Sequence, residues 1–290
     1  MSLLAFGLVF LSAALHVAWN SLARSQRHEP LSAWLLASAG LVVLLPPFAW
    51  SAACGSAWLA PEVVGYAALS GAIETVAFLA LTAGYRESDL SLVYPLSRGL
   101  APVVAAAAGV LLASERIGVR AASAIGVVLA GAAWLAATAT RALDGAARWR
   151  GVKWSLLSAC AVAGYHLSDR AALRHPSAPD TFAYFLLMQL FLVLFMSAWL
   201  MARRVLTRAA LRRVVPLVPR MVLGGLLMQG GYWLVLLALK QGASSLVVAT
   251  RNLGIPLSLL VGVLWFREPV DRPRWLAAAL LTAGILLLAT

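Results

Sequence analysis

The stretch "YPLSRGLAP", residues 94–102, places Arg98 in the middle of an otherwise apolar segment. A second stretch, "VVATRNLGIP", residues 247–256, has the same design around Arg251. An arginine at the centre of a membrane-spanning helix costs about 2.5–3.5 kcal/mol even on the most lenient scales. Two such residues in one apolar chain therefore predict an interior that is not hydrocarbon, which both guanidinium groups face.

The composition indicates a membrane protein. Of the 290 residues, 62% are hydrophobic and 12% are charged, whereas about a quarter of a soluble domain is charged. The net charge of +12 does not indicate nucleic-acid binding, because the basic residues lie mostly in short links between apolar runs, where cytoplasmic loops of membrane proteins collect Lys and Arg. The two cysteines, Cys54 and Cys160, lack metal-ligand spacing, and nothing supports a disulfide between them.

A spanning helix needs about 20 mainly apolar residues, and the chain holds ten such runs. The first is interpreted as a helix rather than a cleaved signal, because no basic residue precedes it and it is long enough to span. The longest link, 202–217, is strongly basic and is expected to lie at the membrane interface. We therefore expect an all-α polytopic membrane protein with transmembrane helices at 3–23, 31–51, 63–85, 90–112, 118–140, 152–174, 179–201, 218–240, 244–266 and 274–290.

The second half of the sequence repeats features of the first in the same order. A shift of 153 residues superposes Arg98 on Arg251. The same shift superposes four further pairs: Ser91 and Ser244, Leu100 and Leu253, Glu115 and Glu268, and Gly131 and Gly284. A shift of 150 superposes His16 on His166 and Arg24 on Arg174. We expect two five-helix repeats, 1–140 and 152–290, joined at 141–151. Because five is an odd number of spans, the second repeat enters the membrane from the opposite side and is inverted relative to the first.

Lys and Arg are distributed unequally between the two sets of links. One set holds sixteen of them, and the other holds only Arg116, Arg120, Arg174 and Lys240. The positive-inside rule places the richer set in the cytoplasm, so both termini are expected outside.

Two longer stretches carry a family likeness: "GYRESDLSLVYPLSRGLAPVVAAAAGVLLASERI" at 84–117 and "QGASSLVVATRNLGIPLSLLVGVLWFREPV" at 241–270. Each ends one helix, turns through a small polar link, begins a helix with an Arg and a Pro, and finishes at an interfacial Glu. With "HVAWN" at 16–20, the chain resembles the EamA-domain members of the drug/metabolite transporter superfamily over nearly its whole length. The resemblance implies a multipass inner-membrane carrier, often an exporter of small metabolites, without identifying the metabolite.

Two roles for Arg98 and Arg251 remain open. Each guanidinium could bind a carboxylate or phosphate of a substrate, for which its planar fork is suited. Alternatively, each could bond backbone carbonyls freed by Pro102 or Pro256, since proline removes a helix hydrogen bond. Under either hypothesis three neighbours are expected to line the same cavity: Tyr94, Pro95 and Asn252.

The first and sixth predicted helices carry matching polar stripes. His16, Asn20 and Arg24 follow one another at intervals of four residues, and the sixth repeats the pattern with His166, Arg170 and Arg174. Asp169, three residues after His166, can approach it on the same face. Each His is either a neutral group bonded across the bundle or part of a proton pathway.

Other candidates complete the expected cavity. Glu74, inside the third helix, is either a proton carrier or the counter-ion of an intramembrane Arg. Gln229 and Tyr232 on the eighth helix and Trp19 on the first are candidate substrate contacts, with Arg98, Arg251, Tyr94, Asn252 and Asn20. The candidate proton-coupling residues are His16, His166, Glu74 and Asp169. We expect the cavity between helices 1, 3, 4, 6, 8 and 9.

The sequence contains no P-loop, HExxH, CxxC or nucleotide-binding glycine motif. We therefore expect no cofactor or metal, no enzyme activity, and transport driven by gradients. The partners expected are a small-molecule metabolite and the lipid bilayer, with a homodimer left open. The leading hypothesis is an alternating-access carrier of small anionic or zwitterionic metabolites, exporting them with protons. The alternatives are a flippase for lipid-linked substrates, or a membrane scaffold or enzyme.

Overall fold

The structure, a computed structural model, describes residues 3–26, 31–53, 60–113, 118–138, 145–173, 175–176, 181–239 and 252–289. Within these ranges the regular structure is helical, with no strand. Helices suit such apolar runs because each satisfies its own backbone hydrogen bonds without water. The elements are α1 (Leu3–Ser25), α2 (Ser32–Ala53), α3 (Pro61–Glu87), α4 (Leu90–Ala113), α5 (Val119–Thr138), α6 (Gly145–Leu173), α7 (Thr181–Ala202), α8 (Arg208–Val214), η2 (Val215–Leu217), α9 (Val218–Leu239), α11 (Gly254–Phe266) and α12 (Arg272–Ala289).

A helix lies at each of the ten expected positions, with two differences. Helix α6 begins at Gly145, so residues 145–151, expected as a link, form its first turns. Only the later part of the ninth expected segment, as α11, lies among the described residues. The basic link at 202–217 contains a short helix, α8, which Thr207 caps by accepting a hydrogen bond from the amide of Ala210 at 3.1 Å.

Five helical segments in the described residues are long and apolar enough to cross a membrane: Pro61–Glu87, Leu90–Ala108, Val119–Thr138, Ala183–Ala202 and Arg208–Tyr232. Two shorter apolar helices, Ser32–Pro46 and Gly254–Phe266, accompany them. Large apolar side chains also point outward, such as Leu129, Leu194 and Leu264, at 49%, 51% and 72% exposure. A water-soluble bundle rarely exposes apolar surface of this extent, so the chain is an all-helical membrane protein.

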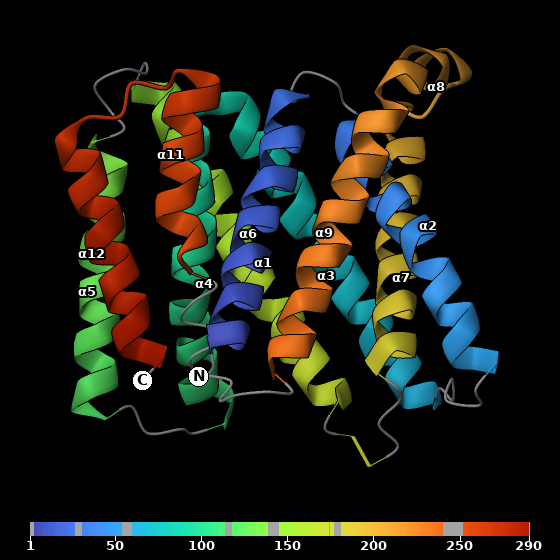
Figure 1. The fold of residues 1–290 in the computed structure, drawn as a ribbon, viewed down its shortest axis with the longest axis horizontal. Helices are drawn as coiled ribbons and strands as arrows, with labels where there is room; N and C mark the ends of the chain where they lie inside the picture. The colour runs from blue at the N-terminus through green and yellow to red at the C-terminus, as the bar shows by residue number, and fades with distance from the viewer. Residues whose placement is uncertain are drawn as a thin grey trace.

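The long helices alternate in direction along one axis of the bundle (Figure 1). The start of α1 and the end of α12 lie together at the lower end in this view, and α8 lies at the upper end. Helices distant in sequence pack together: α3 on α6, α1 on α9, and α5 on α12. The pair α5 and α12 forms one side of the molecule and α2 and α7 the other, with the remaining long helices between them.

Two glycines bring α5 and α12 into close contact. A Cβ on Gly131 would lie 2.6 Å from the backbone nitrogen of Leu281, and a Cβ on Gly284 would lie 2.7 Å from that of Val128. Both pairs that touch are related by the 153-residue shift, since 131 corresponds to 284 and 128 to 281. The contact is therefore reciprocal: each helix offers a glycine to the equivalent turn of the other.

At the upper end of the bundle, buried charges join the two halves of the chain. The Glu268 carboxylate accepts hydrogen bonds from the Leu90 and Ser91 amides, at 2.8 and 3.0 Å, and so caps the start of α4. Burial raises the pKa of this carboxyl, although these amides bond its charged form. Arg24 lies 3.9 Å from Asp89 and 4.0 Å from Glu268.

Arg274, on the first turn of α12, completes this charge cluster of Arg24, Asp89, Glu268 and Arg274. Its guanidinium lies 3.6 Å from the Asp89 carboxylate and donates a 3.0 Å hydrogen bond to the Ser91 hydroxyl. Arg274 is only 1% exposed. Because breaking a buried ion pair leaves the remaining charge uncompensated, the cluster fixes the links that precede α4 and α12 against each other.

We expect Gly131→Ala to destabilise the protein by about 1–3 kcal/mol, because the added methyl overpacks against the Leu281 backbone. Gly126→Ala is the matched control in the same helix, since a Cβ there would have no neighbour within 4 Å. Thermal unfolding of the purified variants measures both. Equal melting temperatures for the two variants would contradict the close α5–α12 contact.

We expect Arg274→Met to cost about 3 kcal/mol, because it removes one of the two guanidinium groups that face the Asp89 carboxylate in this largely buried cluster. Arg150→Met is the control: the Arg150–Glu87 pair is shorter, at 2.7 Å, but the Arg150 side chain is 51% exposed. Exposed pairs are worth about 0–1 kcal/mol. Thermal unfolding should therefore rank the variants by burial of the pair, and a ranking by distance would refute this account of the cluster.

Candidate functional site

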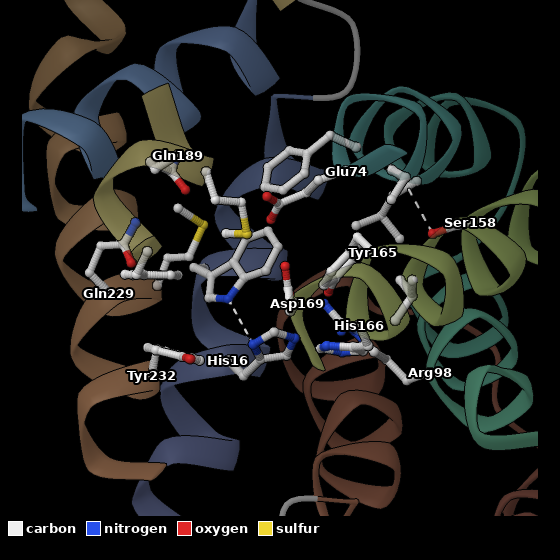
Figure 2. Close-up of a pocket in the computed structure, with 18 of the residues that line it drawn as sticks. His16, Glu74, Arg98, Ser158, Tyr165, His166, Asp169, Gln189, Gln229 and Tyr232 are labelled. Carbon is white, nitrogen blue, oxygen red and sulfur yellow. Dashed lines mark hydrogen bonds between the residues drawn. The ribbon is translucent and has the colours of Figure 1, made fainter. Parts of the chain in front are cut away.

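A cavity of about 660 Å³ lies inside the bundle (Figure 2). Its wall comes from α1, α3, α4, α6, α7 and α9, so both halves of the sequence contribute. Helix α6 begins close to the charge cluster, where a Cβ on Gly151 would touch Ser88, and it ends at Leu173, which lines the cavity. The cavity thus reaches toward the end of the bundle opposite the cluster. The polar groups of its wall are His16, Glu74, Ser97, Arg98, Ser158, Tyr165, His166, Asp169, Tyr184, Gln189, Gln229 and Tyr232.

Arg98 supplies the guanidinium at one side of the cavity. Its side chain donates a hydrogen bond to the hydroxyl of Tyr165 on α6. Glu74, from α3, lies near enough to interact electrostatically with Arg98 and Asp169, and its Oε2 atom is buried without a hydrogen-bond partner. The site therefore combines one fixed cation with two carboxyl groups, one of which has an oxygen available for a ligand or a proton.

His16 and Trp19 form a hydrogen-bonded pair on the α1 wall. The Trp19 indole N–H donates to His16 Nδ1 at 3.0 Å, and the two rings meet edge to face with centroids 5.0 Å apart. Since Nδ1 accepts this bond, the neutral imidazole carries its proton on Nε2. A second proton could enter only at Nδ1, which would break the bond to Trp19. The charge of His16 is thereby linked to the placement of an aromatic wall residue.

Asp169 is held by two hydroxyl groups from other helices. Its Oδ1 atom accepts a hydrogen bond from Ser70 on α3 and another, 2.7 Å long, from Tyr184 on α7. These two bonds direct the carboxylate toward α3 and α7, and the expected approach of Asp169 to His166 stays a prediction. Asp169 therefore ties three helices together at the edge of the cavity.

Most of the residues singled out from the sequence converge on this cavity. Those on its wall are His16, Trp19, Glu74, Arg98, His166, Asp169, Gln229 and Tyr232. Asn20 is fully buried behind the wall, donating to the His16 carbonyl and accepting from the Tyr85 hydroxyl, both at 2.8 Å. Tyr94, Pro95 and Asn252 do not line the cavity either. Arg251 and Arg174, and the side chain of Arg170, lie outside the described residues.

The structure also adds wall residues that the sequence reasoning missed. Helix α7 lines the cavity with Tyr184 and Gln189, although the expected set of helices omitted it, and α6 adds Tyr165. The ninth helix, which that set included, contributes no wall residue from its described part, α11. Gln189 could have been recognised as an isolated amide in the apolar run "FLLMQLFL". Tyr165 and Tyr184 carried no such signal, because tyrosines are common at membrane interfaces.

The sequence matches no protein-family model and no curated protein. The fold matches solved structures, among them one described only as "Crystal structure of protein". That match has a TM-score of 0.59 with 17% sequence identity, and it covers 98% of this chain and 97% of the other. At this identity the similarity concerns the fold alone. Fold and site together define a helical membrane protein with a polar internal cavity.

Proposed function

We propose that this protein is a secondary transporter that moves a small anionic or zwitterionic metabolite across the inner membrane by alternating access. The observation that carries the proposal is the convergence of Arg98, Glu74, Asp169, His16 and His166 on one internal cavity. Ionisable groups inside a membrane protein are costly and mark substrate or proton pathways. A cavity of about 660 Å³ is large enough for a metabolite.

The transporter proposal includes ten spans arranged as two inverted five-helix repeats of the EamA type. In the two repeats, α1 corresponds to α6, α2 to α7 and α3 to α9. The packing supports this arrangement, because the α3–α6 contact has its equivalent in the α9–α1 contact, and the α3–α7 contact in the α9–α2 contact. The reciprocal contact between Gly131 and Leu281 and between Gly284 and Val128 supports it as well. Carriers with such repeats bind substrate between the two halves, which is where this cavity lies.

The position of the cavity relative to the charge cluster also favours a carrier over a scaffold. The cavity extends toward the end of α6, whereas the charge cluster of Arg24, Asp89, Glu268 and Arg274 holds the helices together at the opposite end. Alternating access requires a state that is open on one side only. A scaffold has no need of an internal cavity lined by charged groups.

We further propose that transport is coupled to protons and runs as export. The Glu74 oxygen without a partner and the His16–Trp19 hydrogen bond provide two groups whose proton content can change with the cavity's occupancy. A guanidinium binds a carboxylate through two parallel hydrogen bonds, so Arg98 is assigned to the substrate's anionic group. Glu74 and Asp169 would hold the ammonium group of a zwitterion or the coupled proton.

The proposal predicts that Arg98→Ala abolishes most uptake into proteoliposomes bearing a pH gradient. Pooled metabolites are screened first with the wild type, and transported solutes are then followed with the variants. Hydrogen bonds to charged groups are worth about 1.5–3 kcal/mol, so the apparent affinity should fall about 10- to 150-fold. Arg150→Ala, outside the cavity and exposed, is the matched control and should transport normally.

Two results would count against the proposal. Normal uptake by a well-folded Arg98→Ala protein would refute the role of Arg98 in binding the substrate's anionic group, but it would leave the transport function standing. Absence of accumulation from every pool, with or without a pH gradient, would count against transport itself.

A further inference from the structure

Two buried amides meet at the side of the cavity away from Arg98. Gln189 of α7 and Gln229 of α9 are each 1% exposed and line the wall. Both reach toward Gly40 of α2, where an added Cβ would lie 2.8 Å from Gln229 Nε2 and 3.3 Å from Gln189 Nε2. A glycine at position 40 therefore leaves the space that both amides occupy.

The two amides differ in their hydrogen bonding. Gln189 donates to the carbonyl of Ala37 at 3.0 Å, which anchors it to α2. Gln229 has no hydrogen-bond partner for either its nitrogen or its oxygen, and both atoms are buried. Leaving a buried donor and acceptor unpaired destabilises a protein, whereas an apolar side chain of similar shape would not. An amide held there without a partner is therefore suited to a ligand group that supplies one.

The cavity wall away from the two amides carries the guanidinium of Arg98, and the wall also includes apolar side chains. Figure 2 shows Arg98 and Tyr165 across the cavity from Gln189 and Gln229. The wall also includes rings and thioethers, among them Trp19, stacked on Phe78 at a 5.9 Å centroid separation, and Met228. The cavity thus offers a guanidinium, apolar surface and a pair of neutral amides, with the amides across from the guanidinium.

We propose that Gln189 and Gln229 form a second, uncharged subsite of this cavity. The substrate would then carry an ionised group for Arg98 at one end, an apolar body, and a neutral hydrogen-bonding group, such as a hydroxyl or carboxamide, at the other. An amide suits such a group because it both donates and accepts. The inference rests on the proposed transport function and names its substrate class, but binding to the purified protein can test it without transport.

Matched probe pairs test the subsite through thermal stabilisation of the detergent-purified protein. Each pair shares an ionised end and an apolar body and differs only in a terminal hydroxyl: norleucine and 6-hydroxynorleucine, phenylalanine and tyrosine, 4-phenylbutyrate and 4-(4-hydroxyphenyl)butyrate. A hydroxylated probe should half-saturate the wild type at a concentration about three- to tenfold lower than its mate, the contribution of one hydrogen bond. Gln229→Leu should erase this difference and retain binding of the apolar mate. Gln26→Leu, the same change just beyond the end of α1 and away from the cavity, should keep it.

The melting temperatures of the ligand-free proteins provide a second test. They should change in opposite directions depending on whether Gln229 serves a ligand or a structural role. If Gln229 serves a ligand, Gln229→Leu or Gln229→Met removes an unpaired amide and raises the melting temperature by about 2–4 °C. If Gln229 is a structural bond between helices, both variants lower it. Gln189→Leu should lower it under the proposal, because the variant loses the bond to Ala37.

Three results overturn the subsite: no hydroxylated probe binds better than its mate, the difference survives in Gln229→Leu, or both Gln229 variants melt lower than the wild type. Failure of the transport proposal looks different. In that case the hydroxylated probe still binds the purified protein more tightly than its mate, and Arg98→Ala weakens the binding of both members of a pair equally. Proteoliposomes, however, accumulate no hydroxylated probe.

Discussion

Hydrocarbon around the bundle penalises every exposed ionisable group, and this constraint organises the structure. Outward-facing positions are taken by residues such as Leu129 and Leu264, while Arg98, His16 and Asp169 turn to an internal cavity. Inside, each polar group needs a partner or a ligand, since the surrounding protein supplies little water. The hydroxyls of Tyr165, Ser70 and Tyr184 provide such partners.

The same constraint explains why the helices were predictable. A run of about 20 apolar residues has few alternatives to a helix, so nearly all the expected segments agree with the helices within a few residues. The start of α6 was the exception, because Arg148 and Arg150 interrupt residues 145–151, which therefore carried no signal of an apolar run. There α6 begins before the apolar segment, and Arg150, near its start, pairs with Glu87 at the end of α3.

Convergence of the ionisable residues was also predictable, but their individual contacts were not. Polarity in an apolar helix requires an inward direction, which holds for His16, Glu74, Arg98 and Asp169. Whether an inward residue reaches the cavity or stops at a neighbour depends on side chains from other helices. Asn20 bonds Tyr85, and Asp169 accepts hydrogen bonds from Ser70 and Tyr184. Such pairings follow from packing between distant segments, which spacing along one helix does not report.

The reciprocal glycine contact between α5 and α12 has an evolutionary consequence. It is the geometry that two identical chains adopt around a two-fold axis, with Gly131 on Leu281 and Gly284 on Val128 as its two copies. In a homodimer, any mutation alters both copies at once. In a single polypeptide they mutate independently, so selection can loosen one joint and tighten the other. Val128 and Leu281 already differ, so the two contacts need not be equally strong.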